Sequence, residues 1–157
     1  MQPDPIRSIS VVIPVFQEEA NLAALCEQLW PVLGSLAIDV EVIFVDDGST
    51  DGSFYTLREI ADTRTGVRVI SFRRNAGQTA AMQAGIDAAC HEAIVPLDAD
   101  LQNDPADIPR LLDKLNQGWD VVSGWRKPRS DAALRRNFLS RMANHLISKV
   151  TGVALHD

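Results

Sequence analysis

Short runs of β-branched and other apolar residues alternate along this chain with longer segments in which apolar residues recur at helical spacing. The first run, residues 9–15, is apolar at nearly every position, which is typical of a strand buried on both faces. Strict alternation of strands and helices with short connections predicts a mostly parallel sheet with helices on both faces. The predicted strands are residues 9–15, 40–45, 67–72, 93–97 and 120–123, and the predicted helices are residues 20–33, 52–63, 77–90, 105–118 and 133–150.

The length of the chain limits the number of domains. With 157 residues, of which 46% are hydrophobic, the chain can bury one substantial core but not two full-sized ones. No apolar run approaches the ~18 residues of a membrane-spanning helix, and the N-terminus lacks the layout of a signal peptide. Cys26 and Cys90 are too few for a disulfide scaffold and form no CxxC pair. We therefore expect one α/β domain over residues 1–157, itself soluble and in a reducing compartment.

Charge is distributed unevenly along the chain. Residues 1–123 carry 8 basic and 19 acidic side chains, a net charge of −11, whereas residues 124–157 carry 7 basic and 2 acidic ones, a net charge of +5. An acidic body with a basic C-terminal segment indicates that this segment meets an anion, and a solvated basic helix face explains the charge equally well. The overall net charge of −6 and the lack of interleaved basic and aromatic residues argue against nucleic acid as a partner.

Two carboxylates, Asp98 and Asp100, directly follow the fourth predicted strand. Residues i and i+2 of an extended chain project to the same side, so both carboxylates leave the strand in one direction. Like charges this close repel each other unless one is protonated or a cation lies between them. Oxygen ligands, with Gln102 as a third, suit Mg²⁺ or Mn²⁺, and a turn of Asx caps is the alternative. In parallel sheets ligands bind beyond the carboxyl ends of the strands, here residues 14–18, 46–51 and 98–102.

Asp46 and Asp47 close the second predicted strand and precede turn-forming residues. One of them can cap the following helix while the other faces the cleft and accepts an N–H from a nucleotide base. Turn chemistry alone explains the pair equally well, so both interpretations stay open.

Arginines take the place of a glycine-rich phosphate loop. The chain has neither GxGxxG nor GxxxxGKS/T, so the dinucleotide and P-loop phosphate cradles are absent. A bound phosphate would be held by metal and arginine instead. Arg126 follows the fifth predicted strand, and Arg136 and Ser140 share one face of the last predicted helix, where they could clamp one phosphate.

Five ordered motifs resemble the inverting GT-A glycosyltransferases of family 2. Within that family they are most similar to the polyprenyl-phosphate branch, which includes dolichyl-phosphate mannose synthases and undecaprenyl-phosphate sugar transferases. The resemblance runs from about residue 11 to residue 157, and it is most branch-specific from residue 123 onward. The motifs are VIPVFQE (12–18), VDDGSTDG (45–52), RNAG (74–77), DADLQ (98–102) and GWR (124–126).

The resemblance implies a single GT-A (Rossmann-like) catalytic domain, with residues 124–157 on the acceptor side, and a role for each matching residue. The nucleotide-binding residues that it implies are Pro14, Phe16, Glu18, Asp46, Asp47 and Asp98, and the metal ligands are Asp98, Asp100 and Gln102. The acceptor-phosphate residues are Arg126, Arg136 and Ser140, and Asp157 matches an aspartate that closes the site near the acceptor. The residues implied in catalysis are Asp98, Asp100, Arg126 and Asp157.

The activity that the resemblance implies is inverting, metal-dependent transfer of a sugar from a UDP- or GDP-sugar to a polyprenyl phosphate at the cytoplasmic side of the membrane. Mg²⁺ or Mn²⁺ is the expected cofactor. Gln17 stands where asparagine is commoner, and the chain stops at Asp157 where family members continue, often into transmembrane helices. We therefore expect a truncated C-terminus, and a truncated chain would bind the donor without turning it over.

Other functions stay open beside this one. One alternative is an inactive nucleotide-binding module, and another is a family 2 transferase that acts on a saccharide acceptor. A third alternative is a nucleotidyltransferase. That class usually has a Gly-rich N-terminal loop with Lys or Arg, which residues 11–22 lack.

Overall fold

The computed structural model describes residues 4–124. The chain divides into two units, Met1–Val122 and Ser123–Asp157, and the sheet belongs to the first. The predicted helix over residues 133–150 lies outside the described residues. So do four of the predicted site residues, Arg126, Arg136, Ser140 and Asp157.

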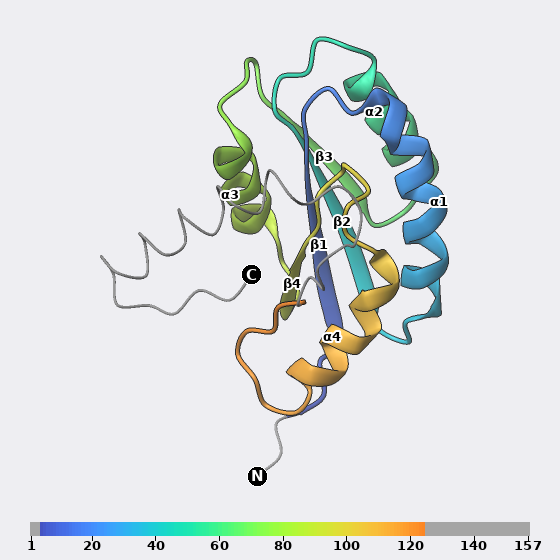
Figure 1. Ribbon diagram of the computed structural model, residues 1–157, viewed down its shortest axis with the longest axis vertical. Coiled ribbons are helices and arrows are strands. Elements are labelled where there is room, and N and C mark those ends of the chain that lie inside the picture. The colour runs from blue at the N-terminus through green and yellow to red at the C-terminus, as the bar shows by residue number, and fades with distance from the viewer. Residues whose placement is uncertain (1–3, 125–157) are drawn as a thin grey trace, which may run out of the picture. The chain divides into compact units, whose positions relative to one another are not determined.

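Four parallel strands form one sheet in the order β3-β2-β1-β4 (Figure 1). Every pairing is parallel, as the alternation of strands and helices predicted. Pro96 is tolerated because it is the last residue of β4, an edge strand of the described sheet. The strands are β1 (Ser8–Val15), β2 (Asp39–Asp46), β3 (Val67–Ser71) and β4 (Ala93–Pro96).

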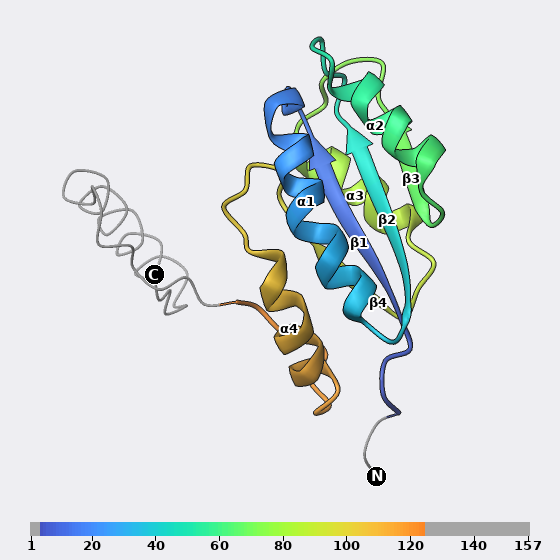
Figure 2. The ribbon, with the colours of Figure 1, turned by 90° about the vertical axis from the view of Figure 1, so that its right-hand side faces the viewer.

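Helices cover both faces of the sheet, which confirms the predicted layers. Figures 1 and 2 show α1, α2 and α4 on one face and α3 on the other. The helices are α1 (Glu19–Ser35), α2 (Ser53–Thr63), α3 (Gln78–Ala88) and α4 (Ile108–Leu115), the last preceded by a 3₁₀ turn, η1 (Pro105–Asp107).

Two apolar clusters hold these layers together. The larger one joins alternate residues of β1 to the buried leucines of α1. The smaller one joins Ile43 and Val45 to Ala81 of α3. Gly85 allows α3 to lie close to the sheet, because a Cβ at this position would overlap the side chain of Val12.

The fifth predicted strand, residues 120–123, is wrong, because these residues form no strand. Two adjacent valines favour an extended backbone, but a strand also needs a partner with which to form ladder hydrogen bonds. The side chain of Val121 is 84% exposed, and residues 120–122 pair with no strand in the part of the chain that the structure describes. Within residues 4–124, no helix has both the length and the apolar character needed to cross a membrane.

Candidate functional site

A cavity of about 340 Å³ lies at the carboxyl end of the sheet. The register explains its place: β1 is central, and its last residues pair with Val45 and Asp46 of β2, while β4 pairs on its other side. The loops that follow β1, β2 and β4 therefore meet there, as parallel sheets predict. The lining residues are Pro14, Val15, Phe16, Glu18, Asp47, Asn75, Gln78, Asp98, Ala99 and Asp100.

Asp98 and Asp100 follow the end of β4 at Pro96, but residues 99 and 100 form a turn, so the chain does not stay extended there as the spacing argument assumed. Leu97 and Ala99 are buried, whereas Asp98 is half-buried and Asp100 is exposed. Both aspartates line the cavity. Gln102 does not line it, but its backbone N–H donates to Asp100 Oδ1 over 3.0 Å.

The donor set at this pair fits a hard divalent cation. The two oxygens of Asp98 accept amide N–H bonds from Gln78 and Asn103, and each oxygen keeps a further lone pair. Asp100 Oδ2 accepts no hydrogen bond from the described residues. Carboxylate oxygens with open lone pairs are the ligands that Mg²⁺ and Mn²⁺ prefer.

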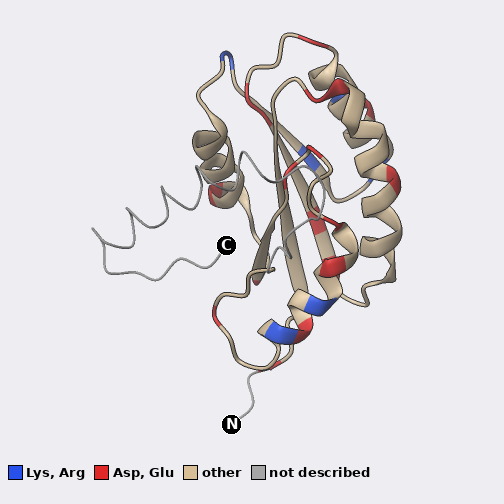
Figure 3. Cartoon of the chain, viewed as in Figure 1, with Lys and Arg blue, Asp and Glu red and all other residues tan. Residues whose placement is uncertain are grey.

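The cavity is strongly acidic. Of the described residues that line it, four are carboxylates and none is Lys or Arg. Figure 3 shows acidic segments, in red, in the loops after β1, β2 and β4. The four carboxylates are Glu18, Asp47, Asp98 and Asp100. An anionic ligand such as a diphosphate would be repelled from this cavity unless a cation came with it.

Asp47 joins the loop after β2 to the start of α3. It is buried, and its two carboxylate oxygens accept the backbone N–H groups of Ala76 and Gly77 over 2.7 and 2.9 Å. Gly48 has a φ of 70°, and a Cβ there would lie 2.7 Å from the Cα of Arg74. Glycine at this position therefore allows the two loops to lie against each other.

Asp46 does not line the cavity, although the resemblance implied a place for it beside the nucleotide. Its exposed fraction is 2%, and it accepts hydrogen bonds from Ser49 N over 3.1 Å and from Ser71 Oγ over 2.8 Å. It therefore ties the end of β2 to its own turn and to β3. Neither Asp46 nor Asp47 caps α2, so that half of the interpretation was wrong, whereas Asp47 does line the cavity, as the other half expected.

Asp51 bonds instead to the start of α2, where its Oδ1 accepts the N–H of Ser53 over 3.0 Å. Burial alone would raise the pKa of Asp51. Hydrogen bonds from Ser53 and from the N–H of Glu19 outweigh this effect, so the pKa of Asp51 is lowered overall. Ser49 Oγ accepts the N–H of Gln17 over 3.0 Å, and Ser53 Oγ accepts that of Glu18. The motif after β2 therefore holds the loop after β1 in place at the rim of the cavity.

Sequence reasoning assigned no role to two polar residues of the lining, Asn75, which lies in the RNAG motif, and Gln78. Both follow β3, whose carboxyl end lies at the same edge of the sheet as those of its neighbours. The rule that ligands bind at the carboxyl ends of strands would have found them if it had been applied to the end of β3 as well.

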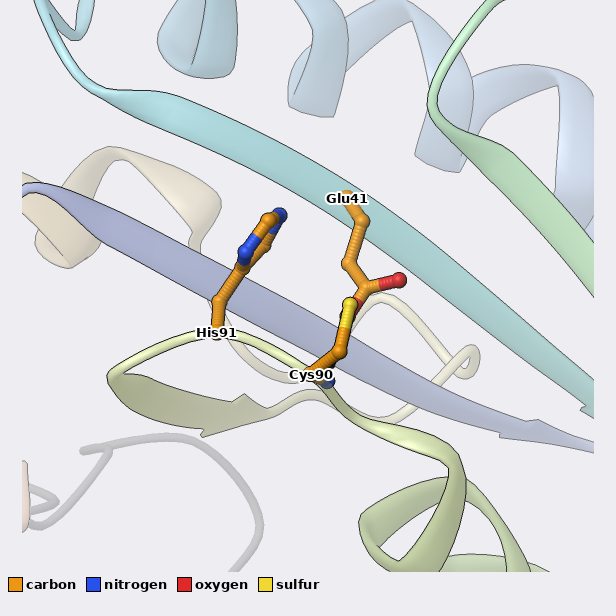
Figure 4. Close-up of side chains that lie close together, drawn as sticks. All are labelled: Glu41, Cys90 and His91. Atoms are coloured by element: carbon orange, nitrogen blue, oxygen red, sulfur yellow. Dashed lines mark hydrogen bonds between the residues drawn. The ribbon is translucent and has the colours of Figure 1, made fainter.

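In a second polar cluster the side chains of Glu41, Cys90 and His91 lie close together (Figure 4). Glu41 is near the start of β2, away from the carboxyl end of the sheet. Glu41 is buried, and its Oε1 accepts hydrogen bonds from Ser10 Oγ, Cys90 N and Cys90 Sγ. Its Oε2 pairs with Arg68 over 3.1 Å. Both oxygens of the Glu41 carboxylate thus accept hydrogen bonds from the protein. These bonds connect β1, β2, β3 and the residues before β4, so the cluster is a structural anchor.

Acid should weaken this anchor. Burial raises the pKa of Glu41, but the hydrogen bonds from Ser10, Cys90 and Arg68 outweigh it and bring the pKa to about 2. Because the pKa is lower in the folded chain than in the unfolded one, Glu41 contributes stability above about pH 4.5, and this is lost as the pH falls toward about 2.

Urea unfolding at pH 7, 4 and 3 measures this contribution. We expect Glu41→Gln to cost about 2 kcal/mol at pH 7 and to flatten the decline of unfolding free energy with acid. Glu27→Gln, which changes an exposed carboxylate on α1, is the control and should keep the decline. An unchanged decline in Glu41→Gln would contradict the role of Glu41.

Known proteins show what this chain is similar to. Over 158 residues, 98% of this chain and 47% of the relative, the chain is 43% identical to a dodecaprenyl-phosphate galacturonate synthase from Rhizobium johnstonii. It is 44% identical to an undecaprenyl-phosphate 4-deoxy-4-formamido-L-arabinose transferase from Pseudomonas paraeruginosa, over 100% of this chain and 46% of the relative. The chain therefore spans about half the length of these curated relatives.

Solved structures confirm the expected GT-A fold. Glucosyl-3-phosphoglycerate synthase from Mycobacterium tuberculosis, in complex with Mn²⁺, UDP-glucose and phosphoglyceric acid, matches 93% of this chain and 51% of its own, with a TM-score of 0.67 and 25% identity. A mannosyltransferase from Pyrobaculum calidifontis, in complex with GDP-Man and Mn²⁺, matches 80% of this chain and 37% of its own, with a TM-score of 0.57 and 25% identity. The family model described as Glycosyl transferase family 2 matches residues 10–155. This match and the identity to the relatives show that the chain belongs to glycosyl transferase family 2.

Proposed function

We propose that this chain is the nucleotide-sugar-binding part of an inverting, metal-dependent transferase that moves a sugar from a nucleoside diphosphate to a polyprenyl phosphate. The observation that carries the proposal is the acidic cavity at the carboxyl end of the sheet, which has no basic residue in its described lining. A dication bound at these carboxylates would offset their repulsion of a nucleoside diphosphate. The two relatives named above act, by their names, on polyprenyl phosphates.

The metal would be held by Asp98 and Asp100, whose carboxylates line the cavity, with Gln102 as the third ligand that the resemblance implies. When bound, it supplies a positive charge that stabilises the negative charge developing on the leaving diphosphate. Both Mg²⁺ and Mn²⁺ fit an all-oxygen donor set. We favour Mn²⁺ for the first experiments because two related structures contain it.

The nucleoside would lie against Pro14, Phe16, Glu18 and Asp47, which line one part of the cavity. Asp46 would stabilise the loop next to the nucleoside through its hydrogen bonds with Ser49 and Ser71.

In the proposed reaction, an oxygen of the acceptor phosphate forms a bond to the anomeric carbon of the sugar while the bond from that carbon to the diphosphate oxygen breaks. The nucleoside diphosphate leaves with the electron pair, and a single displacement inverts the configuration of the carbon. The acceptor oxygen is already ionised at neutral pH, so no strong general base is needed. Arg126, Arg136 and Ser140 would hold the acceptor phosphate and reduce the repulsion between two anions, and Asp157 would close the site near the acceptor.

Titration calorimetry with UDP and GDP, in Mn²⁺, in Mg²⁺ and in EDTA, tests the proposal. We expect one nucleotide to bind at least roughly tenfold more tightly with metal than without, because the cation offsets the charge of the cavity. Equal binding with and without metal would contradict the metal centre. Transfer assays with polyprenyl phosphate and with a saccharide then distinguish the acceptors.

A further inference from the structure

Neutral amide groups hold the carboxylate of Asp98 on both sides. Gln78 Nε2 donates to Oδ1 over 2.8 Å, and Asn103 Nδ2 donates to Oδ2 over 3.3 Å. Asn103 lies in the same loop as Asp98, but Gln78 is the first residue of α3, 20 positions earlier in the chain. The shorter of the two bonds therefore fixes Asp98 from a separate, regular element.

The donor type matters at a cation site. A Lys or Arg partner would fix the carboxylate but would also cancel the charge that attracts a dication. An amide fixes the orientation of the carboxylate and leaves its charge in place. Partners of this kind, which bind a ligating side chain rather than the metal, commonly set metal affinity.

The residue before Gln78 is bonded to Asp47, in the acidic motif that follows β2. This residue, Gly77, has a φ of 96° and donates its N–H to Asp47 Oδ2 over 2.9 Å. The oxygen of Gly77 accepts the N–H groups of Ala80 and Ala81 in the first turn of α3. A continuous series of contacts thus runs from Asp47 through Gly77 and Gln78 to Asp98.

We propose that Gln78 is a positioning residue that fixes the carboxylate of Asp98 in the orientation needed to bind the divalent cation. The inference rests on the proposed function, because it assigns a part of the same metal centre. Gln78 itself lies in neither motif, but through Gly77 and Asp98 it connects the motif after β2 to the motif after β4.

The experiment compares Gln78→Ala with Gln83→Ala in the 157-residue chain. Gln83 lies on the same helix and makes the same kind of bond, donating to Asp87 Oδ1 over 2.7 Å, outside the cavity lining. Mn²⁺ binding in the presence of UDP is measured from the loss of the free-ion electron paramagnetic resonance signal, and thermal unfolding is followed by circular dichroism. We expect Gln78→Ala to bind Mn²⁺ roughly tenfold more weakly, with an unchanged thermal midpoint, and Gln83→Ala to match the unaltered chain.

Saturating Mn²⁺ should restore UDP binding in Gln78→Ala, which a damaged fold would not allow. Equal Mn²⁺ affinity in the two variants would overturn the inference while leaving the metal centre intact. Failure of the unaltered chain to bind Mn²⁺ would overturn the metal centre of the proposed function, and this inference with it. If Gln78→Ala does not fold, Gln78→Asn decides, because its shorter side chain cannot keep the 2.8 Å bond; unchanged affinity in that variant also overturns the inference.

Discussion

Asp98→Asn should abolish metal-dependent binding of UDP or GDP, and it should reduce by about 1,000-fold any sugar transfer that the unaltered chain carries out. The substitution keeps the size of the side chain but removes its charge and replaces one acceptor oxygen by a donor. That NH₂ group would then face the amide of Gln78 or Asn103, which both donate to this carboxylate. The expected loss corresponds to about 4 kcal/mol of transition-state stabilisation, a reasonable value for the charge of a bound metal.

Transfer rate and nucleotide calorimetry with Mn²⁺ measure this effect, and Asp100→Ala should show the same loss. Asp87→Asn is the matched control, because Asp87 is an exposed carboxylate that also accepts a glutamine amide, from Gln83. It should behave like the unaltered chain. Full metal-dependent binding in Asp98→Asn would show that these carboxylates do not hold the cation.

The order of strands and helices was predictable because it depends on local patterns. The apolar run in β1 and the helical spacing of leucines in α1 each follow from neighbouring residues, and both appear in the structure. Residues 120–123 show the limit of such patterns. Val121 and Val122 favour an extended backbone, but whether a partner strand lies beside them depends on the rest of the fold.

The place of the candidate site was predictable in part, for a similar reason. Asp98 and Asp100 both line the cavity, as the sequence suggested, but residues 99 and 100 form a turn and not the extended chain on which that prediction was based. The functions of Asp46 and Asp47 could not be decided, because their partners are distant in the sequence. Asp46 bonds to Ser71, and Asp47 to Ala76 and Gly77. No periodicity within residues 45–52 contains this information.

Asp47→Asn should both destabilise the chain and weaken nucleotide binding. The carboxylate of Asp47 is 2% exposed and accepts two backbone N–H groups, one on each oxygen. Asparagine has a single oxygen, so its NH₂ group would face the N–H of Ala76 or Gly77. Leaving one buried donor without a partner costs about 2 kcal/mol. The start of α3 would then shift, and with it Asn75 and Gln78 in the lining of the cavity.

Urea unfolding and UDP calorimetry on the same variant separate the two effects. Asp104→Asn is the control: Asp104 caps η1 by accepting only the N–H of Ala106, and asparagine caps helices as well as aspartate does. We expect that control to keep both its stability and its affinity. If Asp47→Asn keeps its stability but loses UDP binding, the carboxylate must contact the nucleotide directly. If both fall together, Asp47 acts by holding the loop before α3, which is the outcome that its two backbone bonds predict.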